Sequence, residues 1–161
     1  MSTLVSQLDS ATLRSAFGTF PTGVVAIAAR VDGVRTGFAA SSFVSVSIDP
    51  PLVSICVQNT STTWSTLQDC PTLGVSVLGE AHEEVARALA GQAADRFTDL
   101  DTTTTAEGSV FVDDACAWLD TTVHSSIPAG DHMIVVLRVT GLAVHHRRPV
   151  VFHGSGFRDL R

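Results

Sequence analysis

The chain passes from one short apolar segment to the next through tight turns, with little room for helical connections between them. Residues 24–29 are a continuous run of small apolar side chains, and Asp32-Gly33 then predicts a hairpin turn into a second strand at 34–40. Parallel strands need a crossover of about a dozen residues or more, whereas antiparallel strands can be joined by two. This order therefore predicts a mainly β fold with antiparallel strands.

The rest of the chain continues in the same way. An extended stretch runs from Phe43 to the turn Asp49-Pro50-Pro51, and residues 99–108 resemble a loop. Six or seven strands around one core predict a closed or nearly closed barrel rather than a sandwich, because closure removes exposed strand edges. The further strands are expected at 52–57, 73–78, 115–125, 133–144 and 150–152, with residues 128–131 separating the two long ones.

Two or three short helices are expected beside the strands. The first opens the chain, with Asp9 or Ser10 as its N-cap and Gly18 in the left-handed conformation at its end. Residues 81–90 form the clearest helical pattern, which stops at Gly91. A short helix is also expected through Leu67, with Thr62 or Thr63 as its cap.

Length and composition indicate one globular domain over residues 1–161. Hydrophobic residues make up 45% of the chain and charged residues 16%, which excludes a disordered tail or a coiled coil. So few charges suggest that part of the surface is buried in an oligomer. The net charge of −6, with ten Arg and no Lys, argues against binding to nucleic acid.

The beginning of the chain and its cysteines point to the cytoplasm. Residues 1–7 lack the basic and apolar regions of a signal peptide, and no apolar run is long enough to span a membrane. Cys56, Cys70 and Cys116 are odd in number and widely spaced, which fits neither a disulfide framework nor a zinc site.

Searches for common catalytic motifs exclude several classes. Without Lys there is no Walker-type phosphate loop, and Gly154-Ser155-Gly156 lacks the third glycine of a dinucleotide fingerprint. The six histidines show no metal-ligand spacing, so no metal site is expected. Asp131-His132 enters a strand after a turn, and it is either a turn pair facing solvent or part of a site.

Residues 41–47 contain four serines and lead into the Pro-Pro turn. Small hydroxyls and exposed backbone N–H groups can hold a phosphate or a polar ring edge without a cation. The alternative is a polar edge strand whose serines face water.

Several blocks resemble the short-chain flavin reductases, the reductase components of two-component flavin-dependent monooxygenases. The most specific block runs from Ala40-Ser41-Ser42-Phe43 to Pro50-Pro51-Leu52-Val53. Others are the segments 20–25, 90–97, 130–134 and 149–153, so the resemblance covers residues 17–160. It implies a split β-barrel homodimer that binds flavin near the dimer interface.

The resemblance also implies a set of site residues. His132 is expected to position the nicotinamide cofactor, while small residues and hydroxyls hold the flavin. The implied flavin-binding residues are Thr22, Gly23, Ala39, Ala40, Ser41, Ser42, Phe43, Ser47, Cys56, Val57, Gln58, Asn59, Ser61, Thr63, Arg96, His153, Gly154, Phe157 and Arg158.

The implied activity is NAD(P)H:flavin oxidoreduction, with reduced FMN or FAD passing to a partner monooxygenase. Hydride transfer between two stacked rings needs no acid–base pair from the protein, which agrees with the absence of a catalytic triad. FMN and FAD remain equally open. NADH is favoured over NADPH, because the 2′-phosphate of NADPH would need an Arg, and Arg158 is the only one close in sequence to the expected site.

Two alternatives belong to other classes. The first is a non-catalytic split-barrel protein that binds flavin or haem, in which His145 and His146 would act as ligands. The second is a split-barrel oxidase of a phosphorylated vitamin, which is disfavoured because its phosphate would need an Arg or Lys.

Overall fold

The predicted hairpin opens the sheet. In the computed structural model, which describes residues 2–92 and 96–160, strands β1 (Val25–Val31) and β2 (Val34–Ala40) pair antiparallel. Asp32 and Gly33 have φ of 49° and 80°, the two positive values that a type I′ turn requires. The turn prediction is therefore confirmed.

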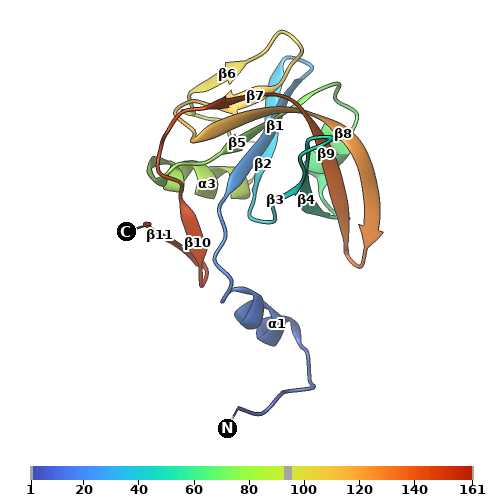
Figure 1. Ribbon diagram of the computed structural model, residues 1–161, viewed down its shortest axis with the longest axis vertical. Helices are drawn as coiled ribbons and strands as arrows, with labels where there is room; N and C mark the ends of the chain where they lie inside the picture. Colours follow the sequence, from blue (N-terminus) through green and yellow to red (C-terminus); the bar gives the residue numbers. More distant parts are fainter. Residues whose placement is uncertain (1, 93–95, 161) are drawn as a thin grey trace.

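The main sheet has seven strands and every pair in it is antiparallel (Figure 1). Its order is β2-β1-β5-β8-β9-β4-β3, so β2 and β3 are its terminal strands. The mainly β, antiparallel prediction is confirmed. The other strands of this sheet are β3 (Val44–Ser47), β4 (Leu52–Gln58), β5 (Leu73–Val77), β8 (Ala117–Ala129) and β9 (His132–Val144).

The sheet curls around a shared core. Ile27 of β1 and Ile55 of β4 belong to the same buried cluster, although three strands separate β1 from β4 in the sheet order. Side chains on one face of a flat sheet could not meet across that distance, since neighbouring strands lie about 4.8 Å apart. Trp64 and Leu67 of helix α2 (Thr62–Leu67) complete this core.

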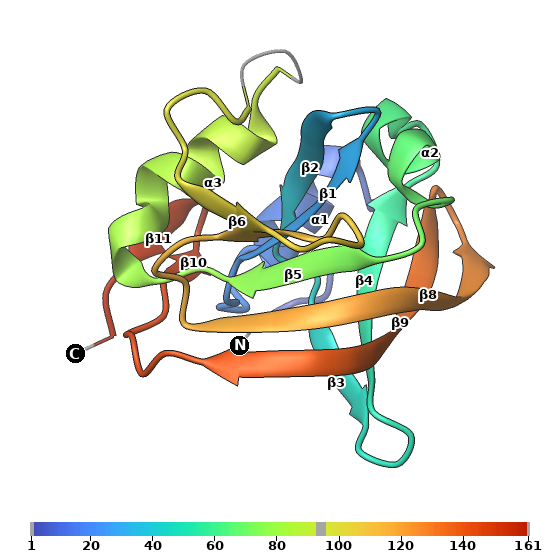
Figure 2. The same ribbon diagram turned by 90° about the horizontal axis from the view of Figure 1, so that it is seen from above.

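Strand β1 is buried on both faces, which explains its run of small apolar residues. Val25 and Ile27 face the core inside the curl, whereas Ala26 and Ala28 pack in a second cluster with Ala86 and Leu89 of helix α3 (Glu83–Ala90). Figure 2 shows α2 and α3 on different sides of the β1–β2 hairpin. A strand covered on both sides has no solvent face and so shows no alternation.

The helices correct three details of the sequence prediction. Helix α1 (Ser10–Phe17) has Asp9 as its N-cap, as expected, but Gly18 is right-handed with φ of −64°. Helix α2 is capped by the Ser61 hydroxyl, which accepts from the Trp64 amide, and not by a threonine. The segment before α3 is a separate 3₁₀ turn, Glu80–His82 (η1).

Four short strands were not fully anticipated. The expected loop at 99–108 contains β6 (Thr102–Thr104), which pairs with β7 (Val110–Val112), and β10 (Val151–His153) pairs with β11 (Gly156–Arg158). Such short strands carry too few residues to show a period. Pro128 lies inside β8 rather than in the turn. At this point only β9 flanks the strand, so there is no second neighbouring strand that would need a hydrogen bond from the missing N–H.

Candidate active site

The strand end at Ala39–Ser42 and the carboxyl end of β4 enclose a pocket of about 440 Å³, called here the central pocket. Helix α3, Arg96 and the start of β9 close its other sides. Most of the expected flavin-binding residues outside the terminal segments thus meet at one place. The lining residues are Phe38, Ala39, Ala40, Ser41, Ser42, Cys56, Val57, Gln58, Ser61, Leu89, Ala90, Arg96 and His132.

The two serines of the pocket have different surroundings. The Ser42 hydroxyl accepts from the Cys56 amide at 2.9 Å and lies 3.2 Å from the Cys56 carbonyl, to which it donates. Ser41 is exposed, and its hydroxyl has no partner among the described residues. Ser42 therefore supports the pocket wall, while Ser41 presents a free hydroxyl at its surface.

His132 reaches the pocket because of the register between β4 and β9. Gln58 lies directly opposite His132 in the antiparallel ladder. The next residue, Asn59, binds the turn before β9: its amide donates to the Asp131 carbonyl at 3.0 Å and its side chain donates to the Gly130 carbonyl at 3.2 Å. Asn59 thus holds the His132 turn in place rather than lining the pocket.

Asp131 orients the His132 ring. Its Oδ1 lies 2.6 Å from His132 Nδ1, and the hydrogen bond together with the charge of the imidazole holds the pKa of the Asp131 carboxyl below its usual range. An ionised carboxylate only accepts, so Nδ1 carries the proton. In the neutral ring Nε2 is then left as an acceptor.

Arg96 joins three elements at the edge of the pocket. Its Nη1 donates to the Gly37 carbonyl and to the Thr63 hydroxyl, both at 2.9 Å, and its Nε donates to the Gly91 carbonyl at 3.0 Å. Thr63 is therefore connected to the site through Arg96. Arg96, which the resemblance named as a flavin-binding residue, thus gives the 59–63 loop a cation from more than thirty positions away.

A second, smaller cavity of about 140 Å³ shares Ala39, Ala40 and Ser41 with the central pocket. Phe152 and Phe157 line its far side, with their ring centroids 5.4 Å apart. The backbones of Thr22 and Phe152 bind each other, and the buried Thr22 hydroxyl has no hydrogen-bond partner among the described residues. Thr22 itself lines neither cavity.

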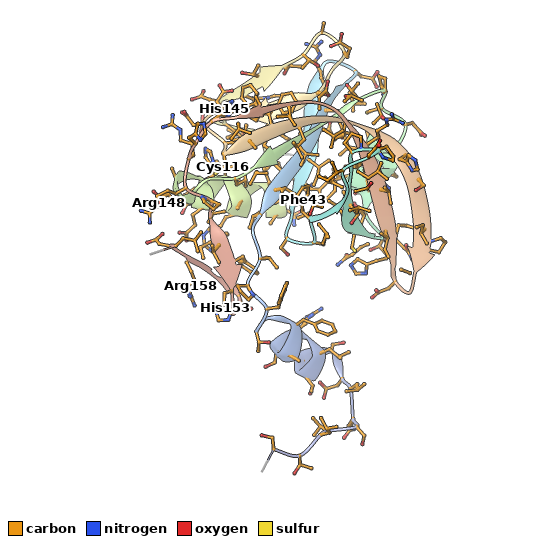
Figure 3. The ribbon with its side chains drawn as sticks, viewed as in Figure 1. Phe43, Cys116, His145, Arg148, His153 and Arg158 are labelled. Atoms are coloured by element: carbon orange, nitrogen blue, oxygen red, sulfur yellow. The ribbon has the colours of Figure 1, made fainter. Side chains whose placement is uncertain are left out.

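The remaining expected residues do not line either cavity. Phe43 packs against the core inside the curl, and Ser47 ends β3. His153 and Arg158 lie on the β10–β11 hairpin, apart from Phe43 (Figure 3). Gly23 and Gly154 also lie outside the lining; the Gly154 amide donates to the Gly18 carbonyl, which joins this hairpin to the end of α1.

Sequence reasoning missed the wall that α3 contributes. Leu89 and Ala90 line the central pocket, and Ala86 and Ala90 line the smaller cavity. The apolar stripe of this helix was visible in the sequence. The sequence alone could not show which cavity this stripe would face.

Among residues 2–92 and 96–160 there is no group of three or more His, Cys, Asp or Glu side chains suited to a metal ion, and the three cysteines are free thiols. His145 lies 2.8 Å from the Ala115 carbonyl and contacts Trp118, and it does not line the central pocket. None of the described helices is both long and apolar enough to cross a bilayer.

Comparison with known proteins identifies the family. Residues 17–161 match the model of the flavin reductase like domain, and the chain belongs to this family. This match confirms the predicted resemblance, and it defines the class of protein as a flavin reductase like protein.

Individual relatives support the same family. The chain is 39% identical over 154 residues to the actinorhodin polyketide dimerase of Streptomyces coelicolor, covering 94% of this chain and 87% of that protein. It is 32% identical over 158 residues to the flavin-dependent monooxygenase reductase subunit HsaB of Mycobacterium tuberculosis, covering 96% and 84%. Some other relatives are longer, and the chain spans about half of their length.

Among solved structures, the NADH:FAD oxidoreductase SgcE6 of Streptomyces globisporus, in complex with NAD and FAD fragments, superposes with a TM-score of 0.92. The two sequences are 34% identical, and the match covers 99% of this chain and 98% of that one.

Proposed function

We propose that this protein is an NADH-dependent flavin reductase that supplies reduced flavin to a separate monooxygenase. The observation that carries the proposal is the central pocket, which places the Ser41–Ser42 strand end, Arg96 and His132 around one cavity. A bound flavin accepts a hydride from NADH. The protein's task is to hold two flat rings face to face, with the reacting atoms ~3–3.5 Å apart.

The residues of the pocket fit a flavin in size and chemistry. Ala39 and Ala40 leave room for a flat ring, because neither side chain extends beyond its Cβ. Ser41 offers a free hydroxyl, and Ser61 and Arg96 lie where a phosphate would meet a hydroxyl and a guanidinium. The cavity volume also lies within the usual range for small-molecule sites.

His132 acts as a positioning residue in this proposal. Asp131 holds its Nδ1, so Nε2 remains available to accept a hydrogen bond from the carboxamide of the nicotinamide. No proton transfer by His132 is needed for the hydride step. Loss of the side chain should therefore weaken the use of NADH rather than abolish the reaction.

A partner monooxygenase gives the reduced flavin a destination. The relative HsaB is named as the reductase subunit of a flavin-dependent monooxygenase, which supports the same role for this chain. The cavity is lined by exposed Ser41, Cys56 and Gln58 as well as buried residues, so a flavin there stays in contact with solvent and can leave. We place the reaction in the cytoplasm.

We also propose that the protein is a homodimer of split β-barrels. Helix α1 buries none of its residues within the chain and lies away from the sheet (Figure 1), where Phe17 is 71% exposed. Ile48 beside β3 is 92% exposed and Leu142 of β9 is 68% exposed. A single chain gains nothing from leaving these side chains in water, whereas a second copy could cover them.

Light scattering after size exclusion tests the dimer. A mass of twice 16.9 kDa is expected for the wild-type protein. Ile48→Asp should shift the population to monomers, and Thr66→Asp on the exposed side of α2 should not. A monomeric wild-type protein would exclude the dimer and leave the reductase proposal standing.

NADH oxidation under air tests the reductase proposal. The absorbance of NADH is followed with purified protein and no flavin, then with FMN and then with FAD. Rapid oxidation that depends on added flavin is expected. Absence of turnover with both flavins and both nicotinamide cofactors, in a protein that still binds flavin, would instead favour the non-catalytic flavin-binding alternative.

A further inference from the structure

A cavity of about 460 Å³ lies on the other side of Arg96 from the central pocket. It sits over the free edge of β2, the terminal strand of the sheet, and we call it the arginine cavity. Arg96 lines both cavities, so the two adjoin at its side chain. The lining residues are Val34, Arg35, Thr36, Gly37, Thr63, Arg96, Phe97 and Thr98.

The lining of this cavity is positively charged in a protein of net charge −6. It contains two guanidinium groups and no carboxylate. Asp32, Asp99 and Asp101 lie on the flanking turn and segment but do not line it. Neither Arg35 nor Arg96 forms an ion pair within residues 2–92 and 96–160.

A third arginine, Arg30, lies close to this charge but does not line the cavity. Arg30 lies directly opposite Arg35 across the hairpin, next to the pair Val31 and Val34 that closes the two-residue turn. In such a hairpin the closing pair, here Val31 and Val34, exchanges hydrogen bonds, whereas the next pair does not. Side chains approach most closely at a pair without hydrogen bonds, which here is Arg30 and Arg35. Like charges at directly opposed positions destabilise a sheet, and a bound anion would remove that cost.

The free edge of β2 contributes backbone donors. The Gly37 carbonyl points away from β1, toward Arg96. In an antiparallel strand the N–H and C=O of one residue point to the same side, so the Gly37 N–H also points to this edge. Gly37 also packs closely on β1, since a Cβ there would lie 2.4 Å from the Ile27 carbonyl oxygen.

The arginines are held in place before any ligand arrives. Arg35 donates to the Phe97 and Leu100 carbonyls and to the Thr102 hydroxyl, at 2.8–2.9 Å, and its guanidinium lies 5.6 Å from the centre of the Phe97 ring. These bonds fix the segment that forms the outer wall. A preorganised cation binds a phosphate without first losing side-chain freedom.

We propose that the arginine cavity binds the pyrophosphate and adenosine half of FAD, so that this reductase prefers FAD to FMN. The inference rests on the proposed function, since it takes the flavin ring to occupy the central pocket. A flavin phosphate beside Arg96 then lies at the border between the two cavities. FMN ends there, whereas the second phosphate of FAD continues toward Arg35, and the adenosine occupies the remaining volume.

Titration calorimetry without nicotinamide tests this assignment independently of turnover. Wild-type protein should bind FAD at least tenfold more tightly than FMN, and ADP should compete with FAD. Thr36→Glu places a carboxylate in the cavity and should weaken FAD binding about tenfold while FMN binding changes less than twofold. Thr36→Gln, which matches glutamate in size but is neutral, should keep the preference for FAD. Thr66→Glu adds the same charge outside the cavity and serves as the control.

Three results would overturn the assignment. One is equal affinity of the wild type for FAD and FMN, and another is an equal effect of Thr36→Glu on both flavins. The third is a rise in the KM for NADH, measured with FMN as acceptor, while FAD binding stays unchanged: the cavity would then hold the adenosine half of NADH. FAD selectivity in calorimetry without any NADH oxidation would instead uphold the cavity and contradict the reductase proposal.

Discussion

The Ser42 hydroxyl hydrogen-bonds both backbone groups of Cys56, accepting from its N–H at 2.9 Å and lying 3.2 Å from its carbonyl oxygen. Ser42 lies two residues beyond the end of β2 and Cys56 lies in β4, and these two strands are five positions apart in the sheet order. The contact therefore holds the curled sheet together at the wall of the central pocket.

This contact gives the two serines separable roles. Ser42→Ala should lower the free energy of unfolding by about 1 kcal/mol, because two hydrogen bonds at a partly buried position are lost. Ser41→Ala should leave stability unchanged and weaken flavin binding. Urea unfolding and calorimetric titration with flavin measure the two effects. If both Ser41→Val and Ser42→Val leave flavin affinity as it is, the strand end does not contact the flavin.

His132→Ala should raise the KM for NADH several-fold and leave flavin affinity within twofold of the wild type. The reason is that Asp131 orients the ring toward the pocket, while the hydride step needs no proton transfer from it. Asp131→Asn should give a smaller change in the same direction, and His132→Gln should recover part of the loss. Steady-state kinetics at saturating flavin provide the measurement. Loss of flavin binding with normal turnover by the remaining holoprotein would contradict a positioning role.

Gly37→Ala, within β2, and Gly23→Ala, shortly before β1, form a matched pair. A Cβ at Gly37 would lie 2.4 Å from the Ile27 carbonyl oxygen and 2.7 Å from the Ala28 Cβ, which should cost roughly 1–3 kcal/mol of stability. At Gly23 no atom lies within 4 Å of the added Cβ, so stability should not change. Thermal unfolding distinguishes them. A weaker affinity of Gly23→Ala for flavin is expected if the backbone there lies against the ring.

The stability of the protein should fall on the acid side of neutrality because of His82. Burial lowers the pKa of this imidazole, whose Nδ1 accepts a hydrogen bond from the Gly79 amide. Its folded-state pKa lies below the unfolded value of about 6.5, so the unfolded state binds more protons between the two. The contribution is complete above the unfolded pKa and is lost as pH falls through the folded pKa.

Urea unfolding at a series of pH values measures this effect. In His82→Gln, which retains an acceptor for the Gly79 amide, the slope of stability against pH should be shallower over that window. An unchanged slope would mean that another group titrates there.

Local structure followed closely from the sequence. The Asp32-Gly33 turn, the antiparallel order of the strands, the Asp9 cap and the end of α3 at Gly91 all depend on residues near one another in the chain. Their physical causes are the backbone conformations and hydrogen bonds of a few adjacent residues. The serine-rich block was also recognisable, and with it the family.

Other features became visible only once the chain was folded. The strands β6, β7 and β11 are three residues long, too short to show a periodic pattern. Strand β1 is buried on both faces, so its sequence is one apolar run that does not indicate which residue faces which side. Phe43 belongs to the serine-rich block and was expected to bind flavin, but it packs against the core. Each outcome depends on which distant element covers a side chain.

Arg96 illustrates the division most clearly. The family resemblance named Arg96 as a flavin-binding residue but not its contacts, and the folded chain places its guanidinium 2.9 Å from the Thr63 hydroxyl and the Gly37 carbonyl. Turns, caps and strand periods are set by neighbours in sequence, and so they can be predicted from it. The charge at the end of the central pocket and the cavity beyond it depend on the curl of the sheet, which brings residues together only through packing across the whole core.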